Sequence, residues 1–136
     1  MNGGAVTWRS SKQSTIADST TESEYIAVNE AAKEVMWIRK FIGDLGFVPS
    51  IRDPVKIFCD NKSAVVLAQE PRSQKHTRHI LRKYHYVRQV VTDRDIVISR
   101  IDTNENLADP FTKPLAQTKH ESHSKCIGIR VLDSVV

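Results

Sequence analysis

The clearest pattern of apolar and polar positions lies between residues 20 and 45, where apolar side chains recur every three or four residues. The repeating positions are Ala27, Ala31, Val35, Ile38, Ile42 and Leu45. This spacing predicts an α-helix from about Thr20 to Leu45 with that face in the core. Ser19 with Glu22 three residues later is a capping box for its start, and Gly46 fits a left-handed C-terminal cap.

Two short apolar runs farther along the chain predict strands. Val55–Cys59 follows Pro54 and ends at Asp60, and Asn61 can then cap a helix through the apolar residues up to Ala68. The second run is 96–101 (IVISRI). Between them, apolar positions 80, 84, 87 and 91 alternate with basic residues and predict a basic amphipathic helix that ends at 93–95.

The two ends of the chain give weaker patterns. Residues 3–18 combine β-branched and aromatic residues with turn-like Ser and Lys, and we expect a β-hairpin there. Residues 107–115 form a short helical or irregular segment interrupted by Pro110 and Pro114, and beyond Ala116 the pattern fades. The order β-β-α-β-α-α-β-α predicts a mixed α/β fold, with helices packed on a sheet that begins antiparallel.

The composition excludes some classes of protein but does not indicate any particular active-site chemistry. With 136 residues, 40% of them apolar, the chain suits one globular domain. The longest apolar run, 64–68, is far below the roughly 20 residues of a membrane-spanning helix, so we expect no membrane association. The chain has two cysteines and its start does not look like a secretory signal. We therefore expect reduced thiols and an intracellular location.

The net charge of +4 is unevenly distributed. Residues 18–33 hold four acidic residues and one basic residue, whereas residues 72–100 hold eight basic residues and two acidic ones. A cluster of positive charge is typical of proteins with a phosphate-rich partner. The acidic cluster is either a solvated face or a cation site.

Three carboxylates fall at the ends of predicted elements. Glu24 lies near the start of the long helix, Asp60 ends a strand, and Asp109 follows the last polar turn. Each also has a purely local interpretation: Thr21 and Glu24 could form a second capping box, Asp60 could cap a helix, and Asp109 could be an N-cap before Pro110. Together they suggest a site for Mg²⁺ or Mn²⁺, which prefer oxygen ligands.

Several motifs, in this order, resemble a known family. They are 8–13 (WRSSKQ), 21–25 (TESEY), 59–64 (CDNKSA), 78–80 (RHI) with Tyr84 and His85, and 108–115 (ADPFTKPL). In order and approximate spacing they resemble the ribonuclease H region at the C-terminal end of copia-type retrotransposon polyproteins. The resemblance spans residues 3–115 and leaves 116–136 as a C-terminal tail.

This resemblance implies an RNase H-like fold that hydrolyses the RNA strand of an RNA–DNA hybrid, with the rest of the polyprotein as a further partner. Glu24, Asp60 and Asp109 match three of the family's four acidic residues, which hold two Mg²⁺ or Mn²⁺ ions. The predicted basic helix would contact phosphates through Arg78, Arg82, Lys83 and Arg88. The family's life cycle places such a protein in the cytoplasm or the nucleus.

One departure from the family affects the expected activity. The family's first acidic residue lies on the first strand of its sheet, and no residue here corresponds to it. We therefore expect an RNase H-like fold without its first strand and a weak or inactive nuclease, because a misplaced reacting group can cost about a hundredfold in rate. The alternatives are a non-catalytic nucleic-acid-binding module and a relic of a decayed element.

Two minor features have ordinary interpretations. His120, His123 and Cys126 are spaced three apart and faintly resemble a zinc site, but no fourth ligand is evident. Cys59 is expected to be a small buried residue, and Trp37, inside the long predicted helix, is expected to lie in the core.

Overall fold

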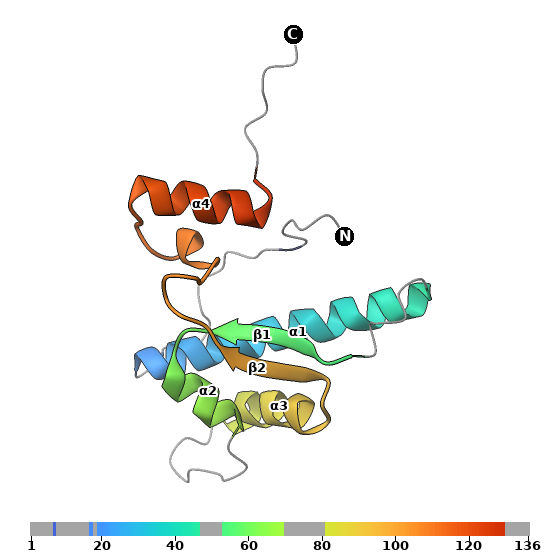
Figure 1. Cartoon of the computed structure of the whole chain (residues 1–136). Helices are drawn as coiled ribbons and strands as arrows, with labels where there is room; N and C mark the ends of the chain where they lie inside the picture. Colours follow the sequence, from blue (N-terminus) through green and yellow to red (C-terminus); the bar gives the residue numbers. More distant parts are fainter. Residues whose placement is uncertain (1–6, 8–16, 18, 47–52, 70–80, 130–136) are drawn as a thin grey trace. The chain divides into compact units, whose positions relative to one another are not determined.

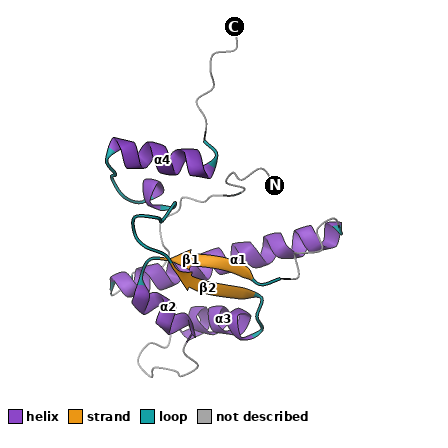
Figure 2. Ribbon diagram, viewed as in Figure 1, coloured by secondary structure: helices purple, strands orange, loops and turns teal. Residues whose placement is uncertain are grey.

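The computed structural model of this chain describes residues 7, 17, 19–46, 53–69 and 81–129. The elements in order are α1 (Thr20–Leu45), β1 (Val55–Cys59), α2 (Lys62–Gln69), α3 (Leu81–Thr92), β2 (Ile96–Arg100), the 3₁₀ helix η2 (Asp109–Phe111) and α4 (Gln117–Ile127) (Figures 1 and 2). They belong to two compact units, Ile16–Ile101 and the remainder of the chain. The hairpin predicted over residues 3–18 lies outside the described residues, apart from positions 7 and 17.

Helix α1 has the bounds that its sequence predicts. Ser19 is the N-cap, and its Oγ accepts a hydrogen bond from the Glu22 N–H at 3.2 Å. At the other end Gly46 has φ 72°, and its N–H donates to the Gly43 carbonyl at 3.1 Å. This left-handed conformation is strained for residues with a Cβ, which explains the glycine.

The predicted apolar face of α1 coincides only in part with the face that the core buries. The core side chains of α1 are Tyr25, Val28 and Ala32. Of the predicted positions, Ala31 and Val35 are partly buried against this core, whereas Ala27 is exposed and Leu45 is about half exposed. Both rows are apolar, so the period identifies the helix but does not select between its faces. The core takes the row that carries the large Tyr25 ring, because burying it removes more apolar surface from water.

Trp37 is also outside the core, contrary to expectation. Its side chain is 62% exposed on α1, and its ring stacks on that of Phe41 with 5.5 Å between centroids. The stacked pair shields part of each ring from water without any contribution from the core.

Strands β1 and β2 pair in parallel, with Val55 opposite Ile96 and Cys59 opposite Arg100. A parallel pair needs a crossover, which α2 and α3 supply. Ile57, Cys59, Ile96 and Ile98 are buried in one core with side chains from α1, α2 and α3, while Phe58 and Val97, at the alternate positions, are exposed. The described fold is thus mixed α/β, with helices gathered on one face of a parallel strand pair (Figure 2).

The second unit contains a helix that the sequence pattern did not predict. Helix α4 ends at Gly128, which has φ 88°, and only His123 among its residues is buried. Helices are usually recognised by an apolar stripe, and a helix with one buried histidine has none. Among the described residues, no helix combines the length and the apolar character needed to cross a bilayer.

Arg39 links α1 to the turn before β2 through an ion pair and a hydrogen bond. Its guanidinium forms an ion pair with the Asp95 carboxylate and also donates to the Asp95 main-chain carbonyl at 3.0 Å. That same carbonyl accepts the Val55 N–H at 3.0 Å, so the contact lies where the two strands begin.

We expect Arg39→Met to lower the free energy of unfolding by about 1–2 kcal/mol, because it removes charge-assisted hydrogen bonds from a partly buried group. Urea unfolding followed by circular dichroism measures the change. Lys40→Met, at the exposed neighbouring position, is the matched control and should change stability by less than about 0.5 kcal/mol. Equal effects of the two substitutions would contradict this role for Arg39.

Candidate metal centre

Glu24 and Asp60 meet at the carboxyl end of β1. Ligand atoms of Glu24, Cys59 and Asp60 all lie within 4.8 Å of one another. Glu24 comes from the second turn of α1, whereas Cys59 ends β1 and Asp60 directly follows it. Groups at the carboxyl end of a parallel strand are well placed for a ligand, so this cluster is the strongest candidate site in the described residues.

The caps of the two neighbouring helices decide against the local interpretations of both carboxylates. Because α1 begins at Thr20 with Ser19 as its N-cap, Thr21 is inside the helix and cannot form the alternative capping box with Glu24. Asn61 caps α2: its Oδ1 accepts the Ala64 N–H at 3.0 Å, and its main-chain carbonyl accepts the Val65 N–H at 3.1 Å. Ser19 and Asn61 therefore cap the two helices, and Glu24 and Asp60 do not serve as caps.

Cys59 contributes a sulfur atom to this cluster, which the sequence did not reveal. Its side chain is 5% exposed, and its S–H faces the Asn61 carbonyl at 3.8 Å. Burial raises the pKa of the Cys59 thiol, and the negative charges of Glu24 and Asp60 raise it further, against a lowering by the contact with Asn61. The thiol is therefore neutral at pH 7, and the charged donors of the cluster are the two carboxylates.

This donor set fits a hard divalent cation. Mg²⁺ and Mn²⁺ prefer carboxylate oxygens and bind neutral thiols poorly, whereas tetrahedral zinc sites depend on thiolate or imidazole. His120, His123 and Cys126 do not form a metal-binding group in the structure: within the described part of the chain, the only group of three such residues is Glu24, Cys59 and Asp60.

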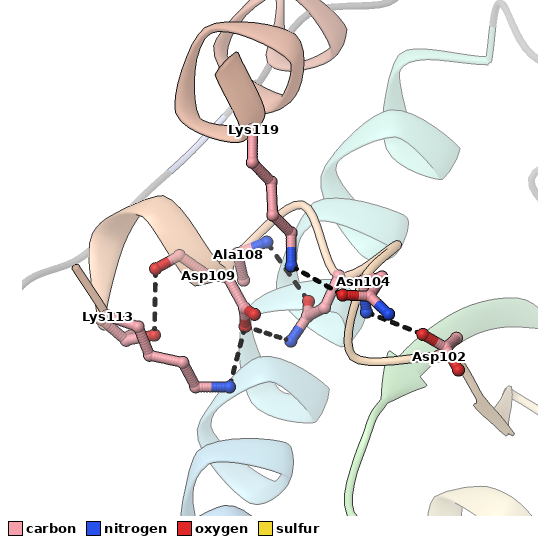
Figure 3. A network of polar contacts seen from close by, with 8 residues as sticks. Asp102, Asn104, Ala108, Asp109, Lys113 and Lys119 are labelled. Carbon is pink, nitrogen blue, oxygen red and sulfur yellow. Dashed lines mark hydrogen bonds and ion pairs between the residues drawn. The ribbon is translucent and has the colours of Figure 1, made fainter. Parts of the chain in front are cut away.

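Asp109, the third predicted carboxylate, belongs to the other compact unit. It is the first residue of η2 and is followed by Pro110, while Ala108 holds the N-cap position. Its side chain is buried, and its Oδ1 accepts hydrogen bonds from Asn106 Nδ2 at 2.9 Å and Lys113 Nζ at 3.0 Å (Figure 3). Asp109 is thus an ionic group held by its own segment rather than a helix cap.

The loop before Asp109 is held by a chain of polar contacts. The Asp102 carboxylate accepts the Asn104 N–H at 2.8 Å, and the Asn104 side-chain oxygen accepts from Lys119 Nζ of α4 at 3.1 Å (Figure 3). Sequence reasoning missed Lys113 as a partner of Asp109. The signal was present, because residues four apart face one another on a helical segment.

The predicted phosphate-contacting residues are described only in part. Arg78 lies outside the described residues, and Arg82 and Lys83 lie in the first turn of α3, where only the backbone is described. Arg88 is partly buried, and its Nε donates to the Leu67 carbonyl at the end of α2, 3.2 Å away. Arg88 therefore helps to pack α3 against α2, and its contact with phosphate stays a prediction.

Sequence comparison places the chain among known proteins. It is 37% identical over 128 residues to the Retrovirus-related Pol polyprotein from transposon TNT 1-94 of Nicotiana tabacum, a stretch covering 94% of this chain and 9% of that protein. The chain is a relative of retrotransposon Pol polyproteins. It is also 34% identical over 124 residues to the Pol polyprotein from transposon RE1 of Arabidopsis thaliana, covering 91% of this chain and 8% of that protein.

A more distant Pol relative comes from a fungus. The Transposon Ty1-NL2 Gag-Pol polyprotein of Saccharomyces cerevisiae is 28% identical over 116 residues, which cover 85% of this chain and 6% of that protein. This Pol-related chain thus spans less than a tenth of the length of these three Pol relatives. No family model matches it, and no solved structure does. The matches confirm the resemblance of the chain to retrotransposon Pol polyproteins.

Proposed function

We propose that this chain is the ribonuclease H portion of a copia-type Pol polyprotein, a region that hydrolyses the RNA strand of an RNA–DNA hybrid, and that the chain alone is weak or inactive in this reaction. The observation that carries the proposal is the convergence of Glu24 and Asp60 at the end of β1, from segments 36 positions apart in the sequence. The mixed α/β fold and the relationship to Pol polyproteins support it. On this proposal the described elements form part of an RNase H-like fold.

Glu24, Asp60 and Asp109 would hold Mg²⁺ or Mn²⁺ in this function. When bound, such ions lower the pKa of a coordinated water and neutralise charge at the phosphodiester. The chain would supply the carboxylates at the ends of its elements, and the reaction requires no protein nucleophile. Cys59, neutral and buried close to the two carboxylates, adds no further negative charge to the site.

The hybrid would be held by phosphate contacts rather than by reading of base sequence. Arg78, Arg82, Lys83 and Arg88 belong to the basic segment that supplies positive charge for this purpose. Discrimination of RNA from DNA would come from the shape of the hybrid and the 2′-hydroxyl group.

Hydrolysis of a labelled RNA–DNA hybrid tests this proposal. The sequence has no counterpart of the family's first acidic residue, so we expect the chain alone to cut the hybrid feebly and a version with an added N-terminal strand bearing an aspartate to cut it in Mg²⁺. The control carries the same strand with asparagine in place of that aspartate. A folded extended chain that binds the hybrid but leaves it intact in Mg²⁺ and in Mn²⁺ would overturn the proposal.

A further inference from the structure

The buried Asp109 carboxylate is held through one of its two oxygens. Oδ1 accepts from both Asn106 Nδ2 and Lys113 Nζ, at 2.9 and 3.0 Å. No donor among the described residues forms a hydrogen bond with Oδ2. The two contacts therefore orient the carboxylate and leave its second oxygen for another partner (Figure 3).

The two donors differ in charge and in mobility. Asn106 is neutral, and both polar atoms of its side-chain amide are hydrogen-bonded. Its Nδ2 donates to Asp109, and its Oδ1 accepts the Ala108 N–H at 3.2 Å. Lys113 carries the positive charge that a buried carboxylate requires. The Lys113 side chain is 43% exposed whereas that of Asp109 is 2% exposed, so the ammonium group lies largely in water while the carboxylate is largely shielded from it.

We propose that Lys113 is the resident counter-ion of Asp109 and competes with a divalent cation for this carboxylate. The inference rests on the proposed function, in which Asp109 is a ligand of Mg²⁺ or Mn²⁺. A cation bound through Oδ2 would lie within a few ångströms of the Lys113 ammonium group, and like charges at that separation repel strongly outside bulk water. Lys113 thus sets the cation concentration at which Asp109 becomes a ligand.

The proposal predicts opposite effects of Lys113→Met without and with metal. Without metal, the variant is less stable than the wild type, because Asp109 stays buried without its counter-ion. With Mn²⁺, the variant binds the ion roughly tenfold more tightly, because the repelling charge is gone. The Mn²⁺-induced rise in melting temperature is therefore larger in the variant than in the wild type.

Mn²⁺ titration by electron paramagnetic resonance, together with thermal unfolding at several Mn²⁺ concentrations, measures both effects. Lys113→Arg keeps the charge and should bind Mn²⁺ as the wild type does. Lys119→Met is the matched control, since it removes a lysine of the same polar network whose partner, Asn104, is neutral. It should leave Mn²⁺ affinity unchanged. Should Lys113→Met fail to fold, Lys113→Gln removes the charge and keeps a donor.

The outcomes separate this inference from the function on which it rests. If the wild type binds Mn²⁺ and Asp109→Asn weakens that binding, Asp109 is a ligand, and an unchanged or weaker affinity of the Lys113→Met or Lys113→Gln variant then overturns the competition. If Asp109→Asn binds Mn²⁺ as tightly as the wild type, the assignment of Asp109 to the metal site fails, and the competition fails with it.

Discussion

Asp60→Asn is expected to weaken Mn²⁺ binding roughly a hundredfold, because even residues that only support metal ligands cost ten- to a hundredfold when replaced. The substitution removes one negative charge and keeps the size of the side chain. It leaves α2 intact, since Asn61 provides the cap through its contact with the Ala64 N–H. In the extended chain described above, the same substitution is expected to abolish measurable hydrolysis.

Electron paramagnetic resonance of free Mn²⁺ gives the affinity directly. Asp53→Asn is the matched control. Asp53 is an exposed aspartate two residues before β1 begins, and it does not belong to the cluster. Its replacement should leave the affinity unchanged. If Asp60→Asn and Asp53→Asn have the same effect, Mn²⁺ binds by surface charge alone and the site is wrongly assigned.

Ile96→Ala should reduce the free energy of unfolding by about 2–5 kcal/mol, the range for deleting a buried isoleucine and leaving a cavity. Ile96 is fully buried, and it pairs with Val55 where the two strands begin. For a domain whose total stability is about 5–15 kcal/mol, this loss could leave much of the chain unfolded at 37 °C.

Urea unfolding followed by helical circular dichroism tests this second prediction. Val97→Ala, one position along β2 and 42% exposed, is the control and should cost less than about 1 kcal/mol. Ile96→Val, expected to cost about 0.5–1.5 kcal/mol, keeps the comparison possible if the alanine variant does not fold. A loss at Val97 as large as that at Ile96 would mean that both faces of the strand pair are covered.

The helices and strands of the unit Ile16–Ile101 could be predicted because the apolar pattern and the capping residues indicate the same element boundaries there. Ser19, Gly46 and Asn61 mark helix ends through hydrogen bonds to nearby backbone, which depend on neighbouring residues alone. The buried face of α1 could be predicted only in part: Ala31 and Val35 pack against the core as expected, but the fully buried row beside them is selected by tertiary packing. Helix α4 was missed because it buries a single histidine.

The candidate site was predictable in part. Glu24 and Asp60 were expected to converge, since helix and strand ends meet at one edge of a sheet, and the structure brings them together. Their neighbour Cys59 was expected to be a small buried residue and is one, but its place beside both carboxylates depends on how α1 packs against β1. Asp109 as a member of the same site stays a prediction.

The parallel pairing of β1 with β2 has a consequence for the order in which the chain folds. Val55 meets Ile96 only after α2, α3 and the segment joining them have emerged, so this pair of strands cannot form as a local hairpin. Contacts between residues so far apart in sequence slow folding, because the loop must be closed before the pairing stabilises it. During synthesis, β1 therefore lacks β2 as its strand partner until residue 100 has left the ribosome.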